Sequence, residues 1–359
     1  MLVTIAIFLI ILLVLVLAHE FGHFLTAKLA GVKVDEFAFG FPPRIASFRK
    51  GETRYSFNLL PVGGFVKIRG EEGDGAEDPG SFASQNFFTK VFIIAAGVIF
   101  NLILAYFLIS GGFMLGTPIP LGDEDVNQEA QIRITEVQRN SPAEAAGLET
   151  GDRILELSFD AERLAVAKIA GIQQFISRHK GQQLAVTLER RGKVIRVEAR
   201  PRLETEPGEG ALGIAMMRFG VEKSSFVQAL GKGFSSTREM TFLTARGLWE
   251  FFADIFSRRA SFESVSGPVG IISIVGDFSR FGLVFLIQLT ALLSINLALI
   301  NLIPFPGLDG GRIFFVIMEK VKGSPFNWKV SRAIHAAGFL LLILLMIIVT
   351  YHDILKLNS

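Results

Sequence analysis

Residues 1–23 read MLVTIAIFLIILLVLVLAHEFGH, an uncharged run that ends in a His-Glu-Phe-Gly-His sequence. About 20 apolar residues are enough for a helix to cross the hydrocarbon core of a bilayer, so this run predicts a membrane span. No basic segment precedes its apolar part, and no clear small-residue cleavage site follows it. We therefore expect a retained span rather than a signal peptide.

Three more stretches lack Asp, Glu, Lys and Arg altogether: residues 91–122, 281–308 and 336–352. Half of the 359 residues are hydrophobic and only 19% are charged, and the charges lie in the segments between these stretches. This distribution excludes a simple soluble globule and a disordered chain. It predicts membrane helices within residues 1–30, 91–115, 281–309 and 336–352, joined to substantial aqueous segments.

The basic residues predict an orientation. Lys and Arg gather near the span ends in segments 31–90 and 310–335, which the positive-inside rule assigns to the cytoplasm. The segment between the second and third spans then lies outside, together with both chain ends. Within it, residues 221–280 predict amphipathic helices at the membrane interface, or else core helices of a soluble subdomain.

Composition also limits the chemistry. The net charge is +2 and no basic cluster is interleaved with aromatic residues, so nothing indicates nucleic acid as a partner. The chain has no cysteine, which excludes disulfides, thiol catalysis and Cys-type zinc sites. A transition metal would have to be held by histidines and carboxylates.

His19 and His23 predict a metal site on the first span. Four residues apart on a helix, their imidazoles lie on one face, and Glu20 between them is placed to act as general base on an activated water. A catalytic zinc normally needs a third protein ligand. Asp309 is the best candidate, because Pro304 and Pro306 break the helix before it on the same predicted side. The alternative for Asp309 is a helix cap at the end of a span.

Residues 129–203 alternate short strands and helices. The run Ser141–Ile154, SPAEAAGLETGDRI, resembles the signature of bacterial PDZ domains. The resemblance implies an α+β PDZ domain over residues 123–205 that accepts peptide C-termini at a sheet edge. The alternative is a PDZ fold that serves only as a plug or spacer.

Taken together, four motifs resemble the site-2 protease family of intramembrane zinc metalloproteases, in its bacterial branch typified by the regulator of sigma-E protease. HEFGH lies in the first span and NLIPFPGLDG at residues 301–310, with the PDZ-like run between the second and third spans. GGFVKI at residues 63–68 matches the family's membrane-associated β-loop, and SGPVGI at residues 266–271 matches another family element.

The resemblance implies a polytopic α-helical membrane protein with four transmembrane helices, a cytoplasmic-side β-loop within residues 31–90 and an inserted extracytoplasmic PDZ domain. It implies Zn²⁺ held by His19, His23 and Asp309, with Glu20 as the base. The residues implied to bind the substrate backbone are Gly64, Phe65, Val66 and Lys67 of the β-loop and Asn296 and Asn301 of the third span.

The implied activity is regulated intramembrane proteolysis: hydrolysis of a single-span membrane protein, such as an anti-sigma factor or a remnant signal peptide, after a prior extracytoplasmic cut. The implied place is the bacterial inner (cytoplasmic) membrane, with the active site toward the cytoplasm. The implied partners are the substrates, the lipid bilayer and peptide C-termini at the PDZ domain.

Two features depart from the family pattern. The best-known members have tandem PDZ domains, whereas this chain has room for one, and Arg312 stands where several relatives have histidine, so it receives no role. Two other functions compete with proteolysis. A non-catalytic membrane scaffold is disfavoured by the complete HExxH sequence with a positioned Asp309, and a small transporter predicts internal repeats that the sequence lacks.

Overall fold

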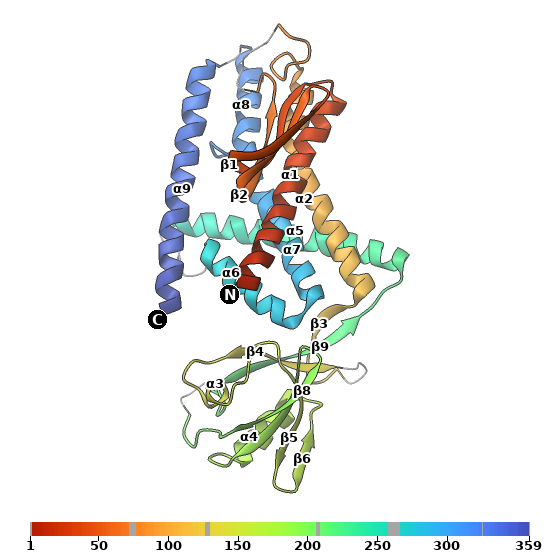
Figure 1. Cartoon of the computed structure of the whole chain (residues 1–359), viewed down its shortest axis with the longest axis vertical. Coiled ribbons are helices and arrows are strands. Elements are labelled where there is room, and N and C mark those ends of the chain that lie inside the picture. The colour runs from red at the N-terminus through yellow and green to blue at the C-terminus, as the bar shows by residue number, and fades with distance from the viewer. Residues whose placement is uncertain are drawn as a thin grey trace. The chain divides into compact units, whose positions relative to one another are not determined.

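The computed structural model describes residues 2–71, 77–125, 130–205, 209–257, 266–324 and 326–358 (Figure 1). The chain forms two compact units. Unit 1 comprises Met1–Ser110, Leu230–Val275 and Gln288–Ser359, and unit 2 comprises Gly111–Ala229 and Gly276–Ile287. Some helices begin in one unit and continue into the other.

Unit 1 is mainly helical, and four helices in the described part of the chain are long and apolar enough to cross a membrane. These are α1 (Leu2–Leu29), α2 (Phe87–Leu115), α7 (Leu283–Leu302) and α9 (Trp328–Asn358). They coincide with the four uncharged stretches of the sequence. The prediction of a polytopic membrane protein is therefore confirmed.

The helix ends differ from those expected from charge alone. α2 begins at Phe87 rather than residue 91, α7 ends at Leu302 rather than 309, and α9 begins at Trp328 rather than 336. α2 and α9 begin before the uncharged stretches because charged residues are tolerated beyond the hydrocarbon core, whereas α7 ends early because Pro304 breaks the helix. Residues 310–335, expected as a loop, contain α8 (Asp309–Lys322), which ends at Gly323 in a left-handed conformation (φ 76°).

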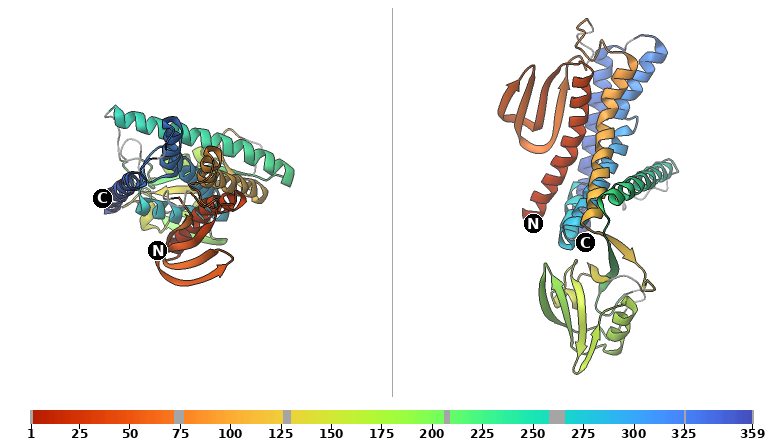
Figure 2. Two further views of the ribbon diagram at one scale, coloured as in Figure 1. Left: turned by 90° about the horizontal axis from the view of Figure 1, so that it is seen from above. Right: turned by 90° about the vertical axis from the view of Figure 1, so that its right-hand side faces the viewer.

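A long antiparallel hairpin follows α1. It consists of β1 (Val34–Lys50) and β2 (Thr53–Ile68), and it lies along the C-terminal half of α1 (Figure 2). Both strands bend, so that Phe37 of β1 is paired with Val66 on one side and with Tyr55 on the other. Among the described residues no strand pairs with the outer edge of residues 64–68.

A buried apolar cluster joins the base of this hairpin to α1 and α2. Its members come from α1, β1, β2, α2 and the connections before β1 and α2: Ala27, Val32, Val34, Ile68, Phe82, Ile93 and Ile94. Burying such side chains stabilises the fold by about 1.5–3 kcal/mol for each large residue. The cluster fixes the hairpin beside the histidine-bearing turn of α1.

The segment expected to contain interfacial helices has two. α5 (Phe226–Phe256) runs across the direction of α9 (Figures 1 and 2), and α6 is Pro268–Phe281. α5 exposes large apolar side chains between charged ones, and its Gly233 packs directly against Ser110 of α2. Residues 258–265 of the predicted interfacial segment lie outside the described residues.

Unit 2 contains a seven-stranded antiparallel sheet. Along the sheet the strands follow the order β3-β9-β4-β5-β7-β8, with β6 paired to β5. Their bounds are β3 (Thr117–Leu121), β4 (Gln131–Val137), β5 (Arg153–Phe159), β6 (Glu162–Ala165), β7 (Leu184–Arg190), β8 (Lys193–Ala199) and β9 (Ile214–Glu222). The sheet thus extends beyond residues 123–205 at both ends, because β3 and β9 pair with each other.

Two short helices cover the sheet, α3 (Pro142–Ala145) and α4 (Ile169–Arg178). α3 is capped at its start, since the Ser141 hydroxyl accepts the backbone N–H of Glu144, and Gly147 follows the helix with φ 75°. Lys168, the residue before α4, makes no side-chain hydrogen bond that caps the helix. Instead the Asp123 carboxylate accepts the N–H groups of Ile169 and Ala170 at 3.0 and 2.9 Å.

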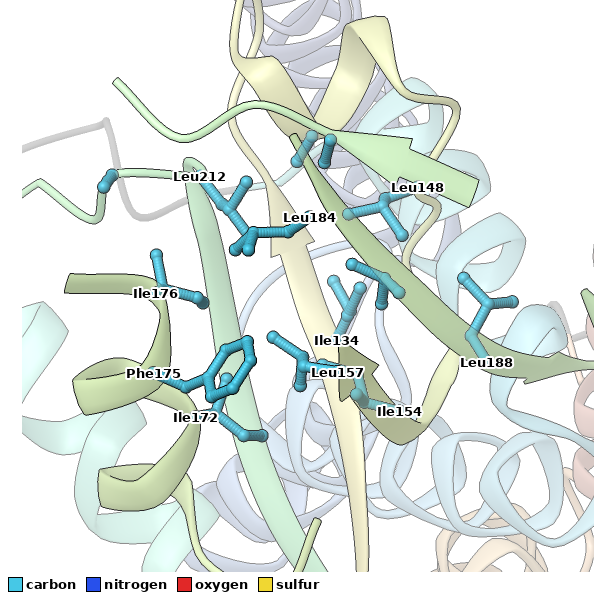
Figure 3. Packing of buried hydrophobic residues seen from close by; sticks show 14 of the residues in the cluster. Ile134, Leu148, Ile154, Leu157, Ile172, Phe175, Ile176, Leu184, Leu188 and Leu212 are labelled. Carbon is cyan, nitrogen blue, oxygen red and sulfur yellow. The ribbon is translucent and has the colours of Figure 1, made fainter. Parts of the chain in front are cut away.

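The core of unit 2 is continuous and apolar (Figure 3). Phe175, Ile172 and Ile176 of α4 pack on residues from four strands, including Ile134, Leu157 and Leu188. Apolar and polar residues alternate along Gln131–Val137, and this pattern puts Ile132 and Ile134 on the inward face. Beside the core, Asp152 is almost fully buried and receives two hydrogen bonds of 2.7 Å from the Arg190 guanidinium.

Candidate active site

The HEFGH sequence lies on α1, where the four-residue spacing puts both imidazoles on one face. His19 and His23 are buried, and their Nε2 atoms are 3.3 Å apart. In a helix of uncharged residues these are expensive side chains to bury. Their approach therefore calls for a third group that binds both.

Asp309 is that group. It stands in the first turn of α8 and is only 8% exposed. Its Oδ2 lies 3.0 Å from His19 Nε2 and 3.2 Å from His23 Nε2. The structure thus brings together three ligand atoms from positions almost 290 residues apart, all within 4.8 Å of one another.

The proline- and glycine-rich loop before α8 explains how Asp309 reaches the histidines. α7 ends at Leu302, just before the first proline, as expected from the loss of a backbone donor. Gly307 then adopts φ +99°. Gly310 lies in α8 and allows a close approach instead of a turn. An added Cβ there would lie 2.3 Å from the carbonyl oxygens of Leu302 and Ile303. Only glycine lets α8 begin this close to the loop.

Glycines also bring α1 and α2 together at the histidines. An added Cβ on Gly97 would lie 2.5 Å from His23 Nε2 and 2.6 Å from His19 Cε1. On the α1 side, a Cβ on Gly22 would lie 2.5 Å from the Ala96 carbonyl oxygen. The imidazoles thus occupy the space that side chains at these positions would fill.

The donor set fits a divalent metal ion. His23 Nδ1–H donates to the Ile93 carbonyl at 2.9 Å, so a neutral His23 presents an Nε2 lone pair toward Asp309. Asp309 Oδ2 is buried and has no hydrogen-bond partner among the described residues. A lone pair and a carboxylate oxygen facing each other in a buried site repel unless a cation lies between them. Two imidazoles and one carboxylate are a typical catalytic zinc set.

Glu20 lies beside these three groups. It is half-buried, makes no hydrogen bond or ion pair with any described residue, and interacts electrostatically with His19, His23 and Asp309. A Cβ on Gly64 of β2 would be 3.7 Å from Glu20 Cγ. β2 therefore runs next to Glu20 at Gly64.

The other residues named from the sequence lie on two elements. On β2, Val66 packs into the cluster at the base of the hairpin, Phe65 stacks on Phe41, and Lys67 is exposed. On α7, Asn296 and Asn301 are half-exposed and make no hydrogen bond with a described residue. The helix stays regular through both positions, so their five-residue spacing puts the two amides on different faces.

Three contacts of the site were not predicted. Asn101 of α2 lies 3.3 Å from His19 Nδ1, the Ile93 carbonyl accepts from His23, and His335 Nδ1 accepts the N–H of Gly307 at 3.0 Å. One signal was available for Asn101, since it is the only amide side chain within the uncharged stretch 91–122. The carbonyl contact has no sequence signal, because every residue carries the same group.

Adding one methyl group at Gly97 should disrupt the site. In Gly97→Ala the new Cβ displaces an imidazole by about an ångström, which costs on the order of 100-fold in activity and lowers the metal content. Gly111→Ala is the matched control, because a Cβ at Gly111 of the same helix meets nothing within 4 Å. Metal analysis of the purified proteins checks this, and equal metal content in both variants would contradict the geometry.

Comparison with known proteins places the chain in a family. A family model described as peptidase family M50 matches residues 7–345. Three bacterial relatives share the name "Putative zinc metalloprotease". The protein of Clostridium perfringens is 33% identical over 342 residues (95% of each chain) and that of Clostridium acetobutylicum 31% over 342 residues (95% of this chain, 94% of the relative). That of Fusobacterium nucleatum is 32% identical over 350 residues (96% of each). With its His-His-Asp group, the chain therefore belongs to peptidase family M50, the site-2 proteases, and is a zinc metalloprotease whose cofactor is Zn²⁺.

Proposed function

We propose that the chain is an intramembrane protease in which His19, His23 and Asp309 hold the zinc ion and Glu20 transfers protons. The observation that carries this proposal is the meeting of the three ligand atoms within 4.8 Å, with Glu20 beside them. A three-ligand site leaves one position open for water and substrate, as catalytic zinc sites do. A purely structural zinc site would be closed by a fourth protein ligand.

Glu20 performs the proton transfers of hydrolysis. When bound, zinc supplies Lewis-acid activation of the attacking water and of the scissile carbonyl. Glu20 accepts a proton from the attacking water and later delivers it to the leaving nitrogen. Because no described residue pairs with its carboxylate, Glu20 is free to take and give this proton.

The free edge of β2 binds the substrate backbone. A transmembrane helix hides its peptide bonds in its own hydrogen bonds, so it has to unwind before attack. Residues 64–67 offer an unpaired strand edge next to Glu20, to which an unwound segment adds as a further strand. Gly64, Phe65, Val66 and Lys67 then act through their backbone. The half-exposed amides of Asn296 and Asn301 offer further bonds to the same peptide.

The hairpin and the spans support a membrane-embedded location. Phe41, Ile45, Phe48, Phe57 and Leu60 are exposed on the hairpin, a pattern typical of membrane contact. With basic residues in segments 31–90 and 310–335, we assign this side to the cytoplasm of a bacterial inner membrane. The substrates are single-span membrane proteins, of the anti-sigma factor or remnant signal peptide kind, shortened by an earlier extracytoplasmic cut.

The sheet of unit 2 is an extracytoplasmic PDZ domain that binds peptide C-termini. Supporting this, residues 214–217 of β9 pair with β4 on one side and with no described strand on the other, whereas residues 218–222 pair with β3 there. α4 contacts β9. The resulting short edge between a strand and a helix suits the last few residues of a peptide.

Glu20→Gln should abolish cleavage while leaving the metal bound. The amide cannot act as a base, so we expect cleavage of a model transmembrane substrate in detergent to fall by at least about 100-fold. Zinc content should stay near one per chain. In His19→Ala or Asp309→Asn, zinc itself should be lost. Cleavage by Glu20→Gln at the wild-type rate would refute the mechanism. If the wild-type protein itself cleaves no model substrate, the non-catalytic scaffold would be favoured instead.

Replacing the amides of α7 should weaken substrate binding without affecting zinc. For Asn296→Ala and Asn301→Ala we expect a rise in KM, corresponding to a hydrogen bond of about 0.5–1.5 kcal/mol for each amide. Gln288→Ala on the same helix is the control and should behave as the wild type. Steady-state kinetics on the same model substrate measure this. An unchanged KM in both variants would exclude the two amides from the substrate site.

Peptide binding by unit 2 should depend on a free carboxylate. Labelled hexapeptides with apolar C-terminal residues should bind the purified full chain, and amidation of their C-terminus should weaken binding about 10-fold or more, the effect of losing a hydrogen-bonded charge. Fluorescence anisotropy compares the two peptide pools. If both peptide pools bound equally, or if neither bound, this part of the proposal would be contradicted and the domain would be a spacer.

A further inference from the structure

Asn101 is a buried amide that faces the metal site. It is 0% exposed, and its Nδ2 lies 3.3 Å from His19 Nδ1. Its Oδ1 is buried and has no hydrogen-bond partner among the described residues. An unpaired buried acceptor costs about 1–3 kcal/mol, so this orientation leaves the amide unsatisfied. A side chain of this kind in an apolar span calls for a function.

His23 shows what a zinc ligand needs on its far side. Its Nδ1–H donates to the Ile93 carbonyl, which leaves Nε2 with a lone pair directed at Asp309. Ligand histidines in metalloproteins usually have such an acceptor, which fixes both the tautomer and the orientation of the ring. The backbone thus prepares His23 for zinc.

His19 has no backbone carbonyl in the corresponding place. To offer Nε2 to zinc, a neutral His19 must carry its proton on Nδ1, and this proton needs an acceptor. The side chain at that position is Asn101. With its nitrogen toward His19, the amide donates to Nδ1 and forces the proton onto Nε2, the wrong tautomer for a ligand. A half-turn of the Asn101 amide exchanges its NH₂ group and its oxygen, which have nearly equal size, and brings Oδ1 to the Nδ1–H of His19.

We propose that Asn101 is a positioning residue for the zinc ligand His19, and that its Oδ1 accepts the His19 Nδ1–H in the zinc-loaded protein. The half-turn gives the buried Asn101 Oδ1 a hydrogen-bond partner and selects the ligand tautomer in the same step. This inference rests on the proposed role of His19 in binding zinc. The side chain of Asn101 on α2 would then select the tautomer of His19, as the Ile93 carbonyl of α2 selects that of His23.

The backbone of Asn101 is held in place independently of its side chain. Ser294 of α7 is fully buried, and its hydroxyl donates to the Asn101 carbonyl at 2.8 Å. Asn101 is therefore linked to α7 through its backbone and to α1 through its amide. A change of the amide can be tested without removing the contact between α2 and α7.

Zinc affinity is the primary test. Chelator competition on purified full-length protein should show Asn101→Leu, which keeps the size but not the acceptor, binding zinc about 10–100-fold more weakly than the wild type. Asn101→Asp keeps an acceptor, and should bind zinc at least as tightly as the wild type. A merely structural role predicts the opposite order, because a buried carboxylate disturbs an apolar span more than leucine does. Wild-type affinity in Asn101→Leu, or weaker zinc binding by Asn101→Asp than by Asn101→Leu, would overturn the proposal.

Two further variants in the same assay separate the possible failures. Ser110→Ala removes another buried polar side chain of α2 and should leave the zinc affinity unchanged. His19→Ala should lose zinc. If His19→Ala keeps its zinc, the proposed metal site is wrong and this inference falls with it. If His19→Ala loses zinc and Asn101→Leu keeps it, the metal site stands and only the role of Asn101 is wrong.

A measurement on the wild type avoids the risk that a variant misfolds. Nitrogen NMR of zinc-loaded protein with ¹⁵N-labelled histidine reports which ring nitrogen carries the proton. We expect a protonated Nδ1 on His19, as on His23, with the His19 signals assigned through their loss in His19→Ala. Coordination of zinc through Nδ1 of His19 would overturn the proposal.

Discussion

The close contact between α1 and α2 is the constraint on which the catalytic arrangement depends. Gly22 and Gly97 remove the side chains that would hold the helices apart, and the imidazoles of His19 and His23 fill the space at Gly97. The same contact brings the Ile93 carbonyl to His23 and the Asn101 amide to His19. Without it, the histidines would face lipid or empty space, and neither ring would be oriented. The arrangement of the site therefore depends on the lack of side chains at Gly22 and Gly97.

Asp309 completes the site from the other side, and at an energetic cost. A carboxylate and two imidazoles buried together are destabilising without an ion, since the folded chain must desolvate all three. Binding free energy of the metal offsets this cost, so folding of the site and zinc binding are coupled. The close backbone contacts of Gly310 and Gly311 with residues 302–306 limit how far Asp309 can move away from the histidines. Apo protein therefore stays close to the geometry that zinc requires.

The three residues that the structure brings together, His19, His23 and Asp309, could be named from the sequence, but the residues that support them could not. HEFGH and the Asp309 segment carry charged or polar residues at the ends of apolar runs. Such residues can be recognised as candidate site residues from one sequence alone. The starts of α2 and α9 were misplaced because charge marks the membrane boundary and not the end of backbone hydrogen bonding. The role of Gly97 could not be predicted because it arises from the contact of two helices, and Asn101 stood out only as a lone amide in an apolar span. No periodicity within α2 reveals what α1 presents to it.

Zinc K-edge X-ray absorption on the purified full-length protein tests the central claim most directly. The proposed site predicts one zinc per chain with about four nitrogen and oxygen neighbours at about 2.0–2.1 Å and the multiple-scattering signal of two imidazoles. In His19→Ala the metal should be lost, or the signal reduced to one imidazole. An unchanged two-imidazole signal in that variant, or a zinc shell without imidazole in the wild type, would contradict a metal centre built from His19, His23 and Asp309.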